Sequence, residues 1–379
     1  MPGPLTGIRV VELEAIGPVP FCGMLFADMG ADVIRVDRAS GGSALGDLAT
    51  LCARGKRSIA VDLKTAAGVD VVHRLAASAD VLLEGFRPGV AERLGIGPEA
   101  IAAVNDRLVY GRMTGWGQEG PLADVAGHDI NYIGLVGALG AIGDDDPVVP
   151  LNLVGDYGGG ALYLAVGVLA ALQERHQSGK GQVVDAAMVD GAASLMTVIY
   201  EMTASGFWQD RRSSNYIDGG APFYRVYATA YGGFMAVGAL EPQFYERLIE
   251  LLGLAEAALP SQHDRSGWPE VAARIAAVFA SQPRAHWEHV FAGEDACVTP
   301  VLSLEEAPHA AHNRIRETFM THSGSTVPAP APRFQRTPSQ PALQKSPRGA
   351  DTASVLSELG VNHDELEALV SAGAVMRTS

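Results

Sequence analysis

The sequence predicts an α/β fold, with a Rossmann-like large domain on a parallel sheet and a smaller α+β domain. Short β-branched runs alternate with segments of helical length through residues 8–113, which is the pattern of successive βαβ units. The pattern changes near Gly158, and a proline-rich stretch at residues 328–347 interrupts the chain again. With 379 residues, the chain is long enough for two or three domains with separate cores.

The first third of the chain contains the predicted parallel sheet. Residues 8–13 (IRVVEL) are β-branched and apolar, and Gly17 and Pro18 end this run before a helix at residues 21–29. Residues 31–37 (ADVIRVD) complete a βαβ unit, whose crossover makes the two strands parallel. The alternation continues with strands at residues 58–63, 81–84 and 108–113 and helices at residues 67–78 and 98–104. This order predicts a doubly wound core.

A long apolar helix is predicted after the glycine triplet at residues 158–160. Residues 161–175 are apolar on all sides and then become charged, which is typical of a buried helix. The positive end of this helix points at residue 156, so Asp156 is expected at the N-cap position. A further helix is expected at residues 186–205.

The second unit is predicted from residues 219–301. Two strand-like runs, at residues 223–230 and 233–237, precede amphipathic helices at residues 242–252 and 268–281. A small domain at residues 219–327 follows from this pattern.

The end of the chain is predicted to return to the large domain, which spans residues 1–218 and is completed by residues 328–379. Six prolines in residues 328–347 favour an extended linker there. Two short helices are expected after it, at residues 350–359 and 364–372.

Composition and charge exclude several classes of protein. The 28 Lys and Arg against 43 Asp and Glu give a formal charge of −15, which disfavours nucleic acid and anionic membranes as partners. The three cysteines, Cys22, Cys52 and Cys297, have neither disulfide nor metal-site spacing, so a reducing compartment is expected and no metal. Neither a signal peptide nor a membrane-spanning segment is evident, and we expect a soluble, cytoplasmic protein.

The first βα turn does not support dinucleotide binding. Asp37 ends the second strand, where a ribose-binding acid would stand, but the turn contains no GxGxxG, and Glu14 and Pro18 would obstruct a pyrophosphate. Basic residues are instead concentrated near the strand ends. They either form a cradle for phosphates or a solvated face. They are Arg35, Arg38, Arg54, Lys56, Arg57, Lys64, Arg87 and Arg93.

Three polar residues are candidates for chemistry, and each also has a structural interpretation. His128, in GHDINY, is either a functional group or a satisfied structural histidine. Asp156, in NLVGDYGGG, and Glu241, before Pro242, are both suitable helix caps. The three glycines after Asp156 weaken the first helical turn, and close approach of a ligand would explain them.

In combination, these segments resemble the family III CoA-transferase superfamily, and within it the racemases that act on alpha-methylacyl-CoA. The motifs extend along almost the whole chain. They include ADVIRVDR, RGKRS, LLEGFRPGVAERLGIGP, RMTGWGQEGP, GHDINY, PLNLVGDYGGG, SGKGQVVDAAMVDG, DGGAPFY and VGALEPQFY. The racemase assignment depends mainly on His128, because transferase members keep the aspartate matching Asp156 as a nucleophile but typically lack the histidine.

The resemblance implies racemisation at the carbon beside a thioester. His128 and Asp156 would then exchange roles as base and acid on opposite faces of that carbon, and Glu241 would orient His128. An apolar pocket would raise the pKa of Asp156. Backbone N–H groups after Asp156, made approachable by the glycines at residues 158–160, are candidate donors to the enolate oxygen.

The resemblance also implies a binding site for coenzyme A, which is part of the substrate, so no separate cofactor is expected. Its implied residues are Arg38, Val61, Asp62, Leu63, Lys64, Gly85, Arg87, Arg93, Gly127, Asp129, Ile130, Asn131 and Tyr132. The acyl chain would be branched and apolar.

The resemblance finally implies an interlocked homodimer, in which each active site is shared and Glu241 serves the partner's site. Three positions differ from the usual pattern of the family: Glu14, Val19 and Tyr231. The alternative functions are CoA transfer through Asp156 as nucleophile and non-catalytic acyl-CoA binding.

Overall fold

The chain forms two compact units in the computed structural model, which describes residues 3–40, 50–322, 324–339 and 343–377. Unit 1 comprises Met1–Val136, Leu151–Leu195 and Ala329–Ser379, and unit 2 comprises Gly137–Pro150 and Met196–Pro328. Each unit has its own hydrophobic core, as two-domain chains of this length do.

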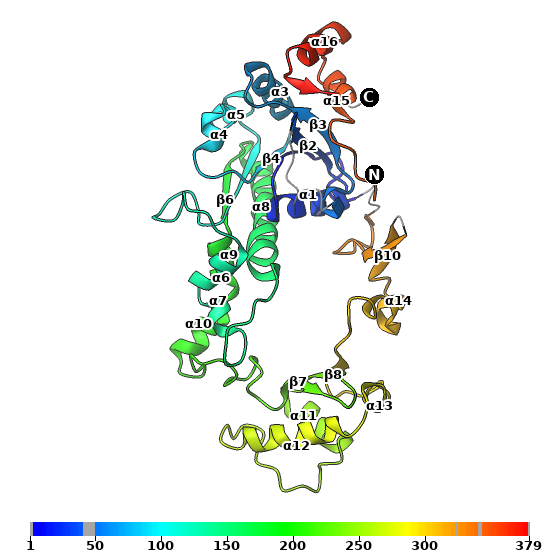
Figure 1. The fold of residues 1–379 in the computed structure, drawn as a ribbon. Helices are drawn as coiled ribbons and strands as arrows, with labels where there is room; N and C mark the ends of the chain where they lie inside the picture. Colours follow the sequence, from blue (N-terminus) through cyan, green and yellow to red (C-terminus); the bar gives the residue numbers. More distant parts are fainter. Residues whose placement is uncertain (1–2, 41–49, 323, 340–342, 378–379) are drawn as a thin grey trace. The chain divides into compact units, whose positions relative to one another are not determined.

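Unit 1 is built on a seven-stranded sheet in the order β12-β3-β2-β1-β4-β5-β6 (Figure 1). Neighbouring strands from β1 to β6 run parallel, and β12 is antiparallel to β3. The order 3-2-1-4-5-6 is that of a Rossmann sheet, so the predicted parallel α/β core is confirmed. The strands are β1 (Arg9–Leu13), β2 (Asp32–Arg38), β3 (Arg57–Val61), β4 (Val81–Glu84), β5 (Val109–Thr114), β6 (Val183–Ala187) and β12 (Val375–Met376).

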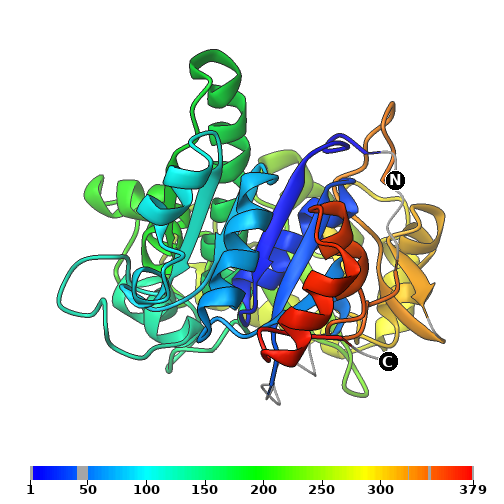
Figure 2. The same cartoon turned by 90° about the horizontal axis from the view of Figure 1, so that it is seen from above.

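Helices cover both faces of this sheet, because alternate strand residues point to opposite sides. On one face, Val10 packs with residues of α1 (Pro18–Asp28) and α8 (Tyr163–Ser178). On the other, Val11 packs with residues of α3 (Ala66–Ala77), α5 (Pro98–Val104), α15 (Thr352–Glu358) and α16 (His363–Ser371). Figure 2 shows α15 and α16, in red, beside the sheet. The short helices η1 (Thr50–Ala53), α4 (Val90–Arg93) and α6 (Asp129–Leu135) complete the unit's first half.

The long apolar helix begins earlier than predicted. A π-helical segment, η2 (Leu153–Leu162), precedes α8 without interruption, and its N-cap is Asn152. Asp156 therefore lies in the first turn and is not the N-cap. By length and composition alone, Leu153–Ser178 is the one described helix that could cross a membrane. In this structure its inner face, including Leu164 and Val168, packs against the sheet.

The prediction of a single helix at residues 186–205 is wrong. The segment begins as strand β6, which adds to the sheet beside β5. It continues as two helices, α9 (Met188–Leu195) and α10 (Thr197–Ala204), separated at Met196. The β-branched pair Val183 and Val184 was a signal for this strand.

Unit 2 contains a three-stranded antiparallel sheet in the order β7-β8-β9. The predicted strands and helices of the second unit are present, and β9 was not predicted. Its core contains Phe223, Trp268 and Phe279. The elements are α7 (Ala138–Ala141), β7 (Tyr224–Ala228), β8 (Phe234–Gly238), α11 (Pro242–Leu251), α12 (Trp268–Ala280), α13 (Arg284–Val290), β9 (Val298–Pro300), η3 (Ala307–His309), α14 (Ala311–Ile315) and a hairpin of β10 (Phe319–His322) and β11 (Ser325–Pro328).

The observed units differ from the predicted domains in two segments. Residues 137–150 and 196–218, predicted in the large domain, belong to unit 2. The guanidinium of Arg212 joins these segments, because it donates to the carbonyl oxygens of Gly140, Asp144 and Asp145. Sequence patterns cannot reveal such a long-range contact.

The chain returns to unit 1 after residue 328. Residues 329–339 and 343–347 contain no helix. Among the described residues, their one β-pairing is an isolated antiparallel bridge between Lys345 and Arg54. Residues 340–342, which include Pro341 of the predicted linker, lie outside the described residues. The two predicted terminal helices are present as α15 and α16, and β12 closes the sheet edge beside β3.

Candidate active site

The candidate site lies at the carboxyl edge of the sheet in unit 1. The strand order reverses between β1 and β4, and ligands of doubly wound proteins bind outside the carboxyl ends of strands at such a point. A cavity of about 240 Å³ is found there. Its lining comes from the segments after β1, β4, β5 and β6 and from the start of α6. Its residues are Ile16, Pro18, Val19, Gly85, Phe86, Arg87, Pro88, Met113, Thr114, Gly115, Trp116, Ala123, Val125, Ala126, Gly127, His128, Tyr132 and Met188.

His128 contributes its side chain to this cavity and is exposed. It is the N-cap residue of α6, where its backbone N–H donates to Asn131 Oδ1 at 3.0 Å. The backbone of His128 also accepts in this cap, because its carbonyl oxygen receives the Asn131 N–H at 2.8 Å. The exposed imidazole lines the cavity, where a ligand can reach it.

The segment that carries His128 is held by aromatic packing. The Tyr132 hydroxyl donates to the Gly127 carbonyl at 2.5 Å, and the Trp116 indole donates to the Val125 carbonyl at 3.1 Å. The two rings meet edge to face at 4.7 Å. Tyr132, expected in the coenzyme A site, is buried, so it supports the cavity wall more than it offers a surface.

The carboxylate of Asp156 lies next to Gly17, in the segment that links β1 to α1. A Cβ atom added to Gly17 would stand 3.3 Å from Asp156 Oδ2. Gly17 has a φ of +76° and lies between two cavity residues, Ile16 and Pro18. A side chain at position 17 would therefore strain the backbone and crowd the carboxylate.

The electrostatic environment of Asp156 favours its protonated form. Burial is the main cause that raises the pKa of this carboxyl, and the negative charge of Asp129 adds to the rise. Asn152, whose amide donates to Asp156 Oδ2 at 3.1 Å, and the nearby His128 oppose the rise. The predicted direction of the pKa shift is therefore confirmed.

His128 and Asp156 thus lie close enough for the charge of one to act on the other, within one unit. Asn152 was not identified from the sequence. Its spacing from Asp156, four residues along the same helix, places the two side chains on one face and was the signal for it.

The glycine triplet does not provide the predicted oxyanion donors. Residues 158–160 lie inside η2, where backbone N–H groups bond to carbonyl oxygens five residues earlier. These glycines instead allow close helix packing, because a Cβ on Gly159 would stand 2.6 Å from Ala192 N of α9. A Cβ on Gly191 of α9 would stand still closer, 1.9 Å from the Gly159 carbonyl oxygen.

The eight basic residues of the predicted cluster separate into two sets. Arg35, Arg54, Lys56 and Arg57 form ion pairs with Asp37, Asp28, Glu12 and Asp32, respectively. The other four side chains are exposed and make no ion pair among the residues that the structure describes. They are Arg38, Lys64, Arg87 and Arg93, and all four belong to the set expected to bind coenzyme A.

The remaining expected coenzyme A residues have varied positions. The side chain of Val61 is buried in the core, and Leu63 packs against it, so these two residues can offer a ligand mainly their backbone. Asp62 accepts the Lys64 N–H at 2.9 Å. Ile130 and Asn131 are exposed on α6 outside the cavity, and Asp129 is buried.

Glu241 lies in unit 2, as the N-cap residue of α11. Its negative charge raises the pKa of the Cys297 thiol, although burial of that thiol is the larger cause. The structural interpretation of Glu241 as a helix cap is supported by its position, although its side chain makes no capping hydrogen bond.

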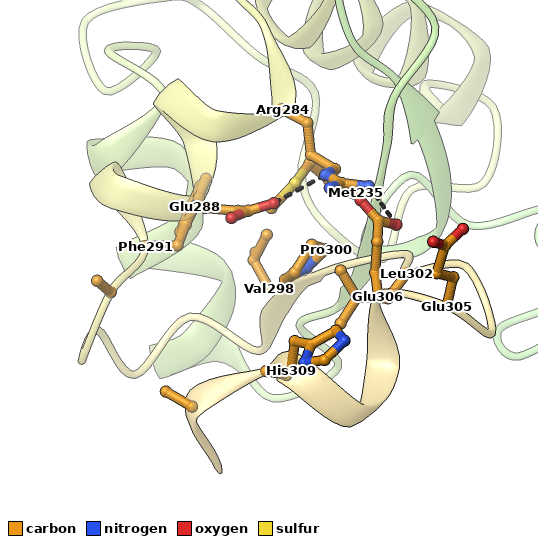
Figure 3. A pocket seen from close by; sticks show the side chains of 13 residues that line it. Met235, Arg284, Glu288, Phe291, Val298, Pro300, Leu302, Glu305, Glu306 and His309 are labelled. Atoms are coloured by element: carbon orange, nitrogen blue, oxygen red, sulfur yellow. Dashed lines mark hydrogen bonds and ion pairs between the residues drawn. The ribbon is translucent and has the colours of Figure 1, made fainter. Parts of the chain in front are cut away.

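Unit 2 contains a larger cavity of about 630 Å³, between α13, β9 and η3 (Figure 3). Arg284 pairs there with Glu288 at 2.8 Å and with Glu306. These bonds lower the pKa of Glu306 to about 2. The central cation of this cavity is therefore neutralised by two carboxylates. Within the described ranges, no group of three or more His, Cys, Asp or Glu residues could hold a metal ion.

Comparisons with known proteins agree on a single family. The model of CoA-transferase family III matches residues 5–352. The chain is 49% identical to a mouse protein named alpha-methylacyl-CoA racemase, over 96% of this chain and 95% of the relative. The human protein of that name is 47% identical, over 97% and 96%. A crystal structure of a CAIB/BAIF family protein from Brucella suis superposes with a TM-score of 0.80 at 25% identity, over 95% of this chain and all of that one.

Proposed function

The chain belongs to CoA-transferase family III, and from this premise we propose that it is an alpha-methylacyl-CoA racemase. It would interconvert the (R) and (S) forms of 2-methylacyl-CoA thioesters. The full-length similarity to two proteins of that name supports this choice. The observation that carries it in the structure is that His128, which lines the cavity, lies near enough to Asp156 for its charge to lower the pKa of that carboxyl.

The proposed reaction moves two protons at one carbon. One group removes the α-proton as a base and leaves an enolate, and the other group delivers a proton to the opposite face. A neutral His128 ring can accept the proton from one enantiomer, while a protonated Asp156 supplies the new one. The other enantiomer uses the reverse roles. The raised pKa of Asp156 suits this exchange, because it makes the protonated acid easier to form.

The enolate oxygen needs hydrogen-bond donors. The first backbone N–H groups of a helix have no partner within it, and those of Asp129 and Ile130 follow His128 directly at the start of α6. We propose these two groups in place of the glycine triplet.

Coenzyme A recognition is proposed for the four unpaired basic residues, Arg38, Lys64, Arg87 and Arg93. Arg87 lines the cavity. Of the others, Arg38 ends β2, Lys64 follows β3 and Arg93 ends α4. Guanidinium groups bind phosphates through paired hydrogen bonds. The chemistry needs neither a metal nor a redox cofactor, and we propose a cytoplasmic location, consistent with the three free cysteines.

A homodimer is proposed from the exposed apolar face of the long helix. Leu162, Tyr163 and Val166 are 48%, 38% and 67% exposed, and Leu195 of the neighbouring α9 is 49% exposed. Burial of such a surface by a second copy is favourable. In the assembled dimer, Glu241 remains our proposed positioning residue for the His128 ring.

The test is proton exchange in D₂O without any acceptor acid. Each enantiomer of a 2-methylacyl-CoA is incubated with the protein, and the α-proton signal is followed by NMR. We expect loss of that signal together with inversion, and no inversion with His128→Ala. If the α-proton persists while coenzyme A moves to an added carboxylate, the protein is a CoA transferase that uses Asp156 as nucleophile. Binding without either reaction would indicate a non-catalytic acyl-CoA-binding protein.

A further inference from the structure

Asp129 stands between the two proposed catalytic groups, and its side chain has no role in the function proposed so far. It follows His128 in the sequence as the first residue of α6, and only 7% of it is exposed. Its Oδ2 atom accepts the backbone N–H of Asp156 at 2.7 Å. One side chain therefore joins the helix end that carries His128 to the helical turn that carries Asp156.

The other carboxylate oxygen of Asp129 is in an unfavourable position. Oδ1 is buried and has no hydrogen-bond partner among the described residues. A buried polar atom without a partner costs free energy, and such a cost is often retained at functional sites. An apolar or neutral residue at position 129 would avoid this cost.

The neighbouring backbone is adapted to this contact. A Cβ atom added to Gly155 would stand 2.6 Å from Asp129 Oδ2 and 2.8 Å from its carboxyl carbon. Glycine at position 155 therefore permits the carboxylate to approach the start of η2. A larger residue there would displace the carboxylate without changing any ionisable group.

We propose that Asp129 is a positioning residue for the acid/base pair, which holds Asp156 at the correct place relative to the His128 ring. This inference rests on the proposed racemase function. Asp129 is not a coenzyme A ligand in this assignment, because its carboxylate is buried and engaged with Asp156.

Asp129 also acts on Asp156 through charge. Its negative charge helps burial to raise the pKa of Asp156, whereas His128 and the Asn152 amide lower it. Asp156 also faces Tyr132 of α6, whose own pKa it helps burial to raise. Asp28 of α1 pairs with Arg54, and Asp185 of β6 and Asp190 of α9 are not among the causes of the shift of Asp156. Removal of the Asp129 charge should therefore lower the pKa of Asp156.

The experiment measures α-proton exchange in D₂O for each enantiomer separately, in the full-length protein. Asp156→Ala and His128→Ala first identify which enantiomer depends on each base. We expect Asp129→Ala to reduce the Asp156-dependent exchange by about 10- to 100-fold, the effect of a misplaced catalytic group, and to leave the His128-dependent exchange almost unchanged. Gly155→Ala should give the same one-sided loss.

Asp129→Asn separates position from charge, since its amide oxygen can still accept the Asp156 N–H. The acid limb of the Asp156-dependent rate should move to lower pH in this variant, which loss of a helix cap would not produce. Asp190→Asn, an exposed acid on α9, is the matched control and should leave both the rates and the acid limb unchanged.

The outcomes separate the two proposals. If the wild-type protein exchanges neither enantiomer, the racemase function is wrong and this inference fails with it. If the wild type exchanges both, but the Asp129 and Gly155 variants slow both equally or neither, the function stands and the role of Asp129 is wrong. Should Asp129→Ala not fold, Gly155→Ala and Asp129→Asn decide between these results.

Discussion

Two groups of cations from the same stretch of sequence occupy opposite environments in unit 1. Lys56 and Arg54 lie beneath α1 and pair with Glu12 and Asp28, and all four side chains are at most 6% exposed. Arg38, Lys64, Arg87 and Arg93 lie near the carboxyl edge of the same sheet and remain exposed. The difference teaches that the position of a cation relative to the strand ends, and not its residue type, decides whether it is buried in an ion pair or left exposed, as in the set that we propose for coenzyme A binding.

The buried pair of Lys56 and Glu12 packs directly against α1. Lys56 Nζ donates to Glu12 Oε2 at 2.5 Å and to the Pro20 carbonyl of α1 at 2.8 Å. A Cβ on Gly23 of α1 would stand 1.7 Å from Glu12 Oε2, so α1 has space for this pair only with glycine there. Burial raises the pKa of Glu12, and Lys56 opposes the rise.

The largest expected effect follows from breaking this pair. Lys56→Met leaves Glu12 buried without its cation, so we expect a loss of about 3–5 kcal/mol in the free energy of unfolding. Urea denaturation measures it. The double variant Glu12→Leu/Lys56→Met is the control and should lose less than the single variant, because no unpaired charge remains. A loss below about 1 kcal/mol for the single variant would place Lys56 with the exposed cations.

The second prediction concerns the exposed set. Arg87→Ala should raise the KM for 2-methylacyl-CoA by about 10- to 100-fold, the value of one or two charge-assisted hydrogen bonds. Its kcat and its urea midpoint should change little, because the side chain forms no ion pair in the described structure. Steady-state kinetics of both enantiomers checks this.

Arg57→Ala is the matched control for Arg87, since Arg57 is held by Asp32 and Glu358. It should lower stability and leave KM unchanged. The reverse result, with KM raised only by Arg57→Ala, would exchange the assignments of the two groups.

Sequence patterns predicted most of unit 1 because its strands are short apolar runs separated by turn residues. The β-branched run at residues 8–13 is an example, observed as β1. The patterns failed where tertiary contacts decide the structure. Val183 and Val184 belong to an edge strand only because β5 lies beside them, and Arg212 joins two segments far apart in the sequence.

The sequence predicted which residues belong to the candidate site, but not the contacts between them. His128 and Asp156 were identified from their motifs, whereas the contact between Asp129 and the Asp156 N–H depends on how α6 meets η2. The glycine triplet was assigned to a ligand because no sequence rule distinguishes close approach of a ligand from close approach of α9. Only coordinates separate these two causes.

The third prediction concerns how much ionised Asp156 lowers the free energy of unfolding. Because the folded state raises the pKa of Asp156 above its ordinary value of 3.8, the ionised form destabilises the fold above that raised pKa. Asp156→Asn should therefore be more stable at pH 7 by roughly 0.5–2 kcal/mol, the usual range for stabilising substitutions, although it loses racemisation. The advantage should shrink as the pH falls through the raised pKa and vanish below 3.8. Urea denaturation across this range measures it, and an equal advantage at every pH would contradict an electrostatic cause.

The smallest loss of stability is expected for an exposed ion pair in unit 2, which serves as the reference for the buried pair of Lys56 and Glu12. Arg274 Nη2 lies 2.7 Å from Glu270 Oε1 on α12, with the two side chains 42% and 52% exposed. Arg274→Gln keeps the helix propensity and should cost only about 0.3–0.5 kcal/mol, a loss that disappears in about 1 M salt because screening already weakens the pair. The distance between nitrogen and oxygen is close to that in the Lys56 and Glu12 pair. A larger loss of stability in Lys56→Met than in Arg274→Gln would therefore identify burial as the cause. Equal losses at low salt would instead mean that burial of Lys56 contributes nothing, and the division of the cations by environment would fail.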